Sequence, residues 1–188
     1  LVAFAACVKP TAIVLCGGPV GLLLLATTPA RKWLVAGLVA SAVGLVILLP
    51  WLIRNALASG NPVFPFAAGL FANAVGGTGH WTAEQVARYH AGHAFSGSLL
   101  SRLALMVMPD QTDPAGPRMR GLLHPQWMLV FPAAAISLIV CLVRRVPRAG
   151  LWGASLGLII VLWLFATHVQ SRFLMPALVP ACVLFSLA

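Results

Sequence analysis

The chain has 188 residues, of which 61% are hydrophobic and 8% are charged, whereas soluble domains carry about a quarter charged residues. Twelve Lys and Arg residues face three acids, which gives a formal net charge of +9. This composition excludes an ordinary soluble domain and a disordered tail, and the scattered basic residues argue against a nucleic-acid-binding surface. We therefore expect an integral membrane protein.

The two ends of the sequence resemble the interior of a longer chain. Residue 1 is Leu, and residues 1–8 are typical of the last turns of an apolar helix. Residues 176–188 stop within an apolar run, and the basic segment and cleavage site of a signal peptide are missing. We therefore expect an internal fragment of a larger membrane protein.

Five apolar segments are expected to cross the membrane as helices. About 20 residues of helix cover the hydrocarbon core of a bilayer, and five segments reach or approach that length. In chain order they are residues 11–28, 33–53, 126–143, 150–167 and 173–188. The sequence thus predicts an all-α fold, a polytopic helical bundle that forms a single transmembrane domain over residues 1–188.

The short links between these segments predict the orientation of the chain. Two crossings separate the links, so both links lie on one side, and their positive charges without acids mark that side as cytoplasmic. The charges are Arg31, Lys32, Arg144, Arg145 and Arg148. The loop 54–125 then faces the periplasm of the bacterial inner (plasma) membrane. An aromatic belt at the two interfaces is expected from Trp33 and Trp152 inside and from Trp51 and Trp127 outside.

The loop 54–125 is expected to contain short helices at the membrane surface. Residues 63–75 and 98–108 are apolar but too short to span, so they would lie in the interface or re-enter it. Between them, Thr82 and Gln85 have the spacing of a capping box, which predicts a helix over residues 83–95.

Polar residues gather at the outer ends of the expected helices. The span interiors contain no ionisable residue, which is unlike an ion-coupled transporter. The polar residues at the outer face are Lys9, Arg54, Asn55, Asn61, His80, His168, Gln170 and Arg172. This distribution indicates a site at the outer membrane surface for a lipid-borne or periplasmic substrate.

Arg54 and Arg172 each allow two interpretations. A guanidinium group binds phosphate through paired, charge-assisted hydrogen bonds, which would suit a lipid-phosphate substrate. An Arg at a helix end also serves as an anchor whose charge reaches the interface, and position alone favours this anchor. Lys9, which precedes the first expected span, has the same two interpretations.

No metal site is predicted. His90 and His93 are three residues apart on the expected loop helix and could supply two ligands, but no third ligand is identifiable. The three acids fit helix-start and turn positions better than a general base, namely Glu84, Asp110 and Asp113. The cysteines lack metal-type spacing and are expected to be buried thiols: Cys7, Cys16, Cys141 and Cys182. The sequence requires no cofactor and leaves a divalent metal open.

Three stretches resemble bacterial GT-C membrane glycosyltransferases, which include dolichyl-phosphate-mannose-protein mannosyltransferase, aminoarabinose transferase and lipopolysaccharide core transferase-like groups. Residues 50–55 (Pro-Trp-Leu-Ile-Arg-Asn) and 60–65 (Gly-Asn-Pro-Val-Phe-Pro) resemble one junction of these enzymes. Residues 170–176 (Gln-Ser-Arg-Phe-Leu-Met-Pro) are similar to their late Gln-x-Arg-Tyr-x-x-Pro element, with Phe173 in place of Tyr. Residues 8–12 (Val-Lys-Pro-Thr-Ala) resemble their lysine-containing turn.

The resemblance implies an enzyme that transfers a sugar from a polyprenyl-phosphate donor to a periplasmic or lipid-linked acceptor, which is a glycan, a lipid or a protein. The implied substrate-binding residues are Arg54, Arg172, Lys9, Gln170 and Asn61. The family's catalytic acid lies in its first outer loop, upstream of this sequence. The alternative is a non-enzymatic polyprenyl-lipid transporter or a structural subunit of an envelope complex.

Overall fold

The computed structural model describes residues 1–64, 66, 67, 70, 71, 84, 85, 87, 88, 98–104, 126–167 and 171–188. Within these residues the chain forms helices and turns and no β-strand, which confirms the all-α prediction. The chain divides into two compact units. Unit 1 contains Leu1–Ile13 and Arg31–Ala94, and unit 2 contains Val14–Ala30 and Phe95–Ala188.

Unit 1 is built on the long helix α3, Trp33–Ser59, which follows the short 3-10 helix η1, Ala30–Lys32. Together Ala30–Ser59 are long and apolar enough to cross a membrane. Large apolar side chains stay exposed along this helix, including Leu34, Val35, Leu38, Val46 and Leu57. Packing within the chain therefore leaves the apolar surface of α3 uncovered.

The end of α3 lies beyond the predicted segment 33–53, so residues 54–59 belong to the helix and not to the loop. Gly60 ends the helix in the left-handed conformation, with a φ of 69°, and its N–H donates to the carbonyl oxygen of Ala56 at 2.8 Å. A residue without Cβ adopts this conformation at low cost. The continuous apolar run stops at Arg54 and Asn55, although the backbone remains helical to Ser59.

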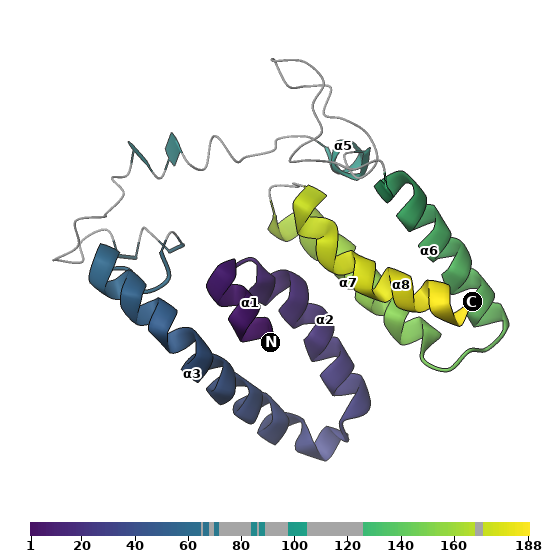
Figure 1. Cartoon of the computed structure of the whole chain (residues 1–188), viewed down its shortest axis with the longest axis horizontal. Coiled ribbons are helices and arrows are strands. Elements are labelled where there is room, and N and C mark those ends of the chain that lie inside the picture. Colours follow the sequence, from purple (N-terminus) through teal and green to yellow (C-terminus); the bar gives the residue numbers. More distant parts are fainter. Residues whose placement is uncertain are drawn as a thin grey trace. The chain divides into compact units, whose positions relative to one another are not determined.

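The helix α1, Val2–Val8, lies beside α3 in unit 1 and confirms the helix expected at residues 1–8 (Figure 1). The Cys7 thiol donates to the carbonyl oxygen of Ile47 at 3.6 Å. A Cβ at Gly44 would lie 3.9 Å from the Cβ of Ala3. Because residue 3 lies opposite residue 44 and residue 7 opposite residue 47, the two helices run in the same direction.

Unit 2 contains α2 from Val14 onward and all later elements. In chain order the elements are α2 (Ala12–Thr27), α5 (Leu99–Ala104), α6 (Gln126–Val143), α7 (Ala149–Ala166), the 3-10 helix η2 (Ser171–Ala177) and α8 (Leu178–Leu187). Cys141 Sγ lies 3.9 Å from the Leu184 carbonyl oxygen, so α6 and α8 are neighbours. The helix α7 is also long and apolar enough to cross a membrane. Shorter apolar helices occupy Ala12–Thr27, Trp127–Val143 and Phe173–Leu187.

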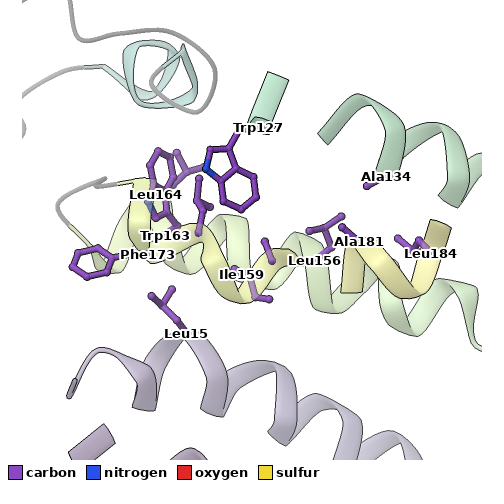
Figure 2. Packing of buried hydrophobic residues seen from close by; sticks show 12 residues of the cluster. Leu15, Trp127, Ala134, Leu156, Ile159, Trp163, Leu164, Phe173, Ala181 and Leu184 are labelled. Carbon is purple, nitrogen blue, oxygen red and sulfur yellow. The ribbon is translucent and has the colours of Figure 1, made fainter. Parts of the chain in front are cut away.

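The core of unit 2 extends along α7 and α8, from Trp127 and Trp163 at one end to Ala181 and Leu184 at the other (Figure 2). Trp163 is fully buried, and the ring of Trp127 stacks on that of Phe131 with centroids 5.2 Å apart. Leu15 of α2 points into the same cluster (Figure 2). Trp127 was expected in the outer aromatic belt, but it is 1% exposed and fills the core. A Trp at a helix end looks the same in sequence whether its ring faces lipid or protein.

The helices α6 and α7 approach each other closely at Gly153. A Cβ at this position would lie 2.8 Å from both terminal methyl carbons of Leu138, which is closer than real contacts allow. The missing side chain therefore lets Leu138 of α6 pack against the backbone of α7, as is common between membrane helices.

Of the short helices expected in the loop 54–125, one is confirmed and one is wrong where the structure describes it. The segment 63–75 is not helical where it is described, because Val63, Phe64, Phe66 and Ala67 lie in turns, so this prediction is wrong for these residues. Ala67 has a left-handed φ of 53°, which a helix does not permit. The helix expected within 98–108 is confirmed by α5. Thr82 and most of the predicted helix 83–95 lie outside the described residues.

Arg102 connects α5 to the end of α7. Its Nη1 donates to the carbonyl oxygen of Leu164 at 2.6 Å, and the Thr167 hydroxyl donates to that of Trp163 at 2.6 Å. The last carbonyls of a helix have no partner within the helix, and a cation there also interacts favourably with the helix dipole. The sequence showed Arg102 only as an interruption of an apolar run.

We expect Arg102→Ala to lower the free energy of unfolding by about 1 kcal/mol, because a charge-assisted bond to the Leu164 carbonyl is lost. The measurement is the thermal midpoint of the purified protein in detergent, followed by tryptophan fluorescence. Arg88→Ala is the control, since Arg88 pairs with Glu84 at 2.5 Å on an exposed helical segment. Exposed pairs contribute about 0.5 kcal/mol or less. An equal decrease of the thermal midpoint in both variants would contradict the proposed stabilisation of the end of α7 by Arg102.

Candidate functional site

The residues after α3 form a compact turn organised by Asn61. The Asn61 side chain is buried, its Oδ1 accepts the Val63 N–H at 2.9 Å, and its Nδ2 donates to the Phe66 carbonyl oxygen at 2.7 Å. Both polar ends of the amide are thus used by loop backbone. This geometry gives Asn61, predicted as a substrate-binding residue, a direct role in shaping the turn.

Two side chains of α3 hold this turn against the helix. Asn55 Nδ2 lies 3.3 Å from the Phe64 carbonyl oxygen and donates to it. The Ser59 hydroxyl donates to the Asn55 carbonyl oxygen at 2.8 Å and accepts the Asn61 N–H at 3.3 Å. The role of Ser59 was not predicted, although its position four residues after Asn55 and directly before Gly60 is a signal for such a helix end.

Arg54 lies in the last two turns of α3, five residues before its end at Ser59, and its side chain is exposed. It makes no hydrogen bond or ion pair with the other residues that the structure describes. Residues 33 to 54 rise about 32 Å along a helix axis, which is close to the thickness of a bilayer's hydrocarbon core. The guanidinium is therefore available to an anion at the end of a helix of membrane-spanning length.

Lys9 lies at the same end of unit 1. It follows α1, its side chain is half-buried, and its N–H donates to the Ala5 carbonyl oxygen at 2.8 Å. Because Cys7 lies opposite Ile47 on a parallel helix, Lys9 precedes the level of Arg54 by roughly 7 Å along the axis of α3. Lys9, Arg54 and Asn61 are thus brought to one end of unit 1.

The remaining predicted site residues belong to unit 2. Gln170 lies outside the described residues, and for Arg172 the structure describes the backbone, within η2, but not the side chain. The next residues, Phe173 and Leu174, are buried in the core of unit 2. The buried side chain of Phe173 thus anchors η2 in the core of unit 2. Arg172 is the residue directly before Phe173 in the chain.

The described residues contain no group of three or more His, Cys, Asp or Glu that could hold a metal ion. The histidines considered as ligands, His90 and His93, lie outside the described residues, as do Asp110 and Asp113. All four cysteines are free thiols. Cys141 is buried as expected, Cys7 and Cys16 are partly buried, and Cys182 is exposed, so the expectation of burial is wrong for Cys182.

Comparison with known proteins gives one match. A family model described as a domain of unknown function (DUF8201) matches residues 1–74. The matched region includes α1, α2, α3 and the turn around Asn61, and therefore Lys9 and Arg54. No curated protein and no solved structure matches the chain.

Proposed function

We propose that this chain is part of a polytopic protein of the bacterial inner membrane, in which α2, α3, α6, α7 and η2 with α8 cross the bilayer. Support comes from Ala30–Ser59 and α7, which are long and apolar enough to span, and from the three shorter apolar helices. Exposed Leu, Val and Ile side chains along α3 would be unfavourable in water but favourable beside acyl chains.

We further propose that the protein is a glycosyltransferase that takes its sugar from a polyprenyl phosphate at the periplasmic interface. The observation that carries this proposal is the exposed guanidinium of Arg54 at the end of α3. The hydrogen bonds of Asn55 and Asn61 fix the backbone around it, and Lys9 adds a second cation at this end of unit 1. The resemblance to GT-C enzymes at these positions supports the choice of ligand.

In the proposed reaction an acceptor hydroxyl or amine attacks the anomeric carbon of the sugar. The bond between this carbon and the phosphate oxygen breaks, and the lipid phosphate leaves with the electron pair. Arg54 stabilises the negative charge that develops on this leaving group, an effect that is large when the donors are already in place. A carboxylate outside residues 1–188 would accept the acceptor's proton.

The alternative is a transporter or a structural subunit. Only a transferase would break the bond between the sugar and the lipid phosphate and join the sugar to an acceptor. The purified protein would be placed in liposomes with a polyprenyl-phosphate sugar labelled in the sugar, together with a membrane extract that supplies acceptors. Free polyprenyl phosphate together with labelled acceptor identifies a transferase. Movement of intact donor between the leaflets identifies a transporter, and intact donor without such movement identifies a structural subunit.

We expect the turn after α3 to face the periplasm and the link between α6 and α7 to face the cytoplasm, because of the charges in the short links. Leu70 and Pro147 are both exposed and suit cysteine labelling in an otherwise cysteine-free protein. In intact spheroplasts, a membrane-impermeant maleimide should label Leu70→Cys, and it should label Pro147→Cys only after lysis. The reverse pattern would invert the topology and place Arg54 on the wrong side.

A further inference from the structure

The link between α6 and α7 carries three arginines with exposed side chains, Arg144, Arg145 and Arg148. Neither the link nor the first turn of α7 contains an acid. The link is ordered by backbone hydrogen bonds from the Val146 N–H to the Cys141 carbonyl oxygen at 2.8 Å and from the Arg145 N–H to that of Leu142 at 3.1 Å. The charges are thus presented on a defined helix end.

Two of these arginines occupy backbone conformations that favour glycine. Arg145 has a φ of 55° and Arg148 a φ of 66°, and the other described non-glycine residue with positive φ is Ala67. Arg145 stands at a Schellman-type end of α6 and Arg148 at the N-cap of α7, and at both places glycine would avoid the steric cost of a Cβ. Arginine at both positions therefore costs stability, which points to a use for the side chains rather than for the turn.

The surroundings of the arginines indicate that use. Arg144 Nη1 donates to the carbonyl oxygen of Ala188 at 2.6 Å, whereas the guanidinium groups of Arg145 and Arg148 have no hydrogen-bond or ionic partner in the described part of the chain. Leu142 and Val143, directly before the link, are exposed, so the charges border an apolar surface. An apolar surface edged by guanidinium groups matches the boundary between acyl chains and phosphate headgroups.

We infer that Arg145 and Arg148 bind the phosphate of an anionic phospholipid headgroup at this end of unit 2. The inference rests on the proposed membrane embedding but not on the proposed transferase activity. A guanidinium group forms paired hydrogen bonds with phosphate oxygens, and a basic residue near an anionic membrane surface strengthens binding about fivefold. The two arginines together should therefore favour an anionic lipid over a zwitterionic one by about 30-fold.

The test measures binding of phosphatidylglycerol and phosphatidylcholine to the purified full-length protein by native mass spectrometry in mild detergent. Arg145→Gly with Arg148→Gly should weaken phosphatidylglycerol binding about 30-fold and leave phosphatidylcholine binding unchanged. The same double variant should raise the thermal midpoint in detergent alone, because glycine relieves the left-handed positions. The control is Arg31→Gly with Lys32→Gly, which removes equal charge from η1 in unit 1 and should weaken binding much less.

Unchanged phosphatidylglycerol binding in the Arg145 and Arg148 variant would overturn the inference. An equal loss in the Arg31 and Lys32 control would also overturn it, because general surface charge would then explain the preference. Alkaline carbonate extraction of the wild-type membranes separates this failure from that of the proposed function. A protein that resists extraction but shows no lipid preference refutes only the lipid site, whereas an extracted protein refutes the membrane embedding itself.

Discussion

Arg54→Lys should reduce sugar transfer from a polyprenyl phosphate by about 30- to 1000-fold, because a guanidinium contact that strengthens in the transition state contributes about 2–4 kcal/mol. Lys keeps the charge but loses the planar pair of donors. Arg172→Lys, in the second resembling stretch, is expected to have an effect of the same size. If either residue were only an interfacial anchor, Lys would replace it well, since both side chains extend to the interface.

The measurement is the transfer rate of the purified full-length protein, with its thermal midpoint recorded beside it. Arg88→Lys is the matched control, because Arg88 is an exposed arginine that pairs with Glu84. Its rate should equal that of the wild type. Full activity in Arg54→Lys and Arg172→Lys would assign both residues to anchoring and remove the main support for the phosphate site.

Trp163→Ala should destabilise the protein by about 3–5 kcal/mol, the range found when a large buried aromatic is truncated. Trp163 is fully buried among α6, α7 and η2, so its loss leaves a cavity that the rigid helices fill poorly (Figure 2). The expected readout is a large drop in the thermal midpoint and faster proteolysis. Packing of this kind matters in lipid as well, since it depends on contacts between side chains.

Trp33→Ala is the control for this prediction. Trp33 starts α3 and is 46% exposed, so its truncation opens no cavity and should change the midpoint little. A similar small effect in both variants would mean that the core of unit 2 is loosely packed around Trp163.

Helix positions were predictable where length and apolarity decide them, and the bounds of α6 agree with the expected segment 126–143, whereas the end of α3 was not predicted. The segment 33–53 was found because a continuous apolar run of that length has few other uses. The last turns of α3 depend on the Ser59 hydroxyl and the Gly60 conformation, which are local hydrogen bonds that hydropathy does not detect. The error at residues 63, 64, 66 and 67 has the same origin, because Asn61 binds the backbone that a helix would have used.

That Lys9 and Arg54 lie at the same end of unit 1 was predictable from the sequence, but the roles of the neighbouring asparagines were not. Lys9 precedes α2, and Arg54 lies near the C-terminal end of α3. Because the two expected membrane crossings, 11–28 and 33–53, separate these residues, both are predicted to face the same side. The parallel packing of α1 on α3 brings them to one end of unit 1 independently of any membrane. The structural roles of Asn55 and Asn61 could not be predicted, because they depend on where the chain turns back after Gly60.

The bond from Arg102 to Leu164 has a consequence for the order in which the protein forms during synthesis. The two residues are 62 positions apart in the chain. At a synthesis rate of about 5–20 residues per second, Arg102 is added to the chain about 3–12 s before its acceptor Leu164. The segment around α5 must therefore wait until α7 has been made before it can dock. A substitution that unwinds the end of α7 would then leave α5 undocked, although every residue of α5 is intact.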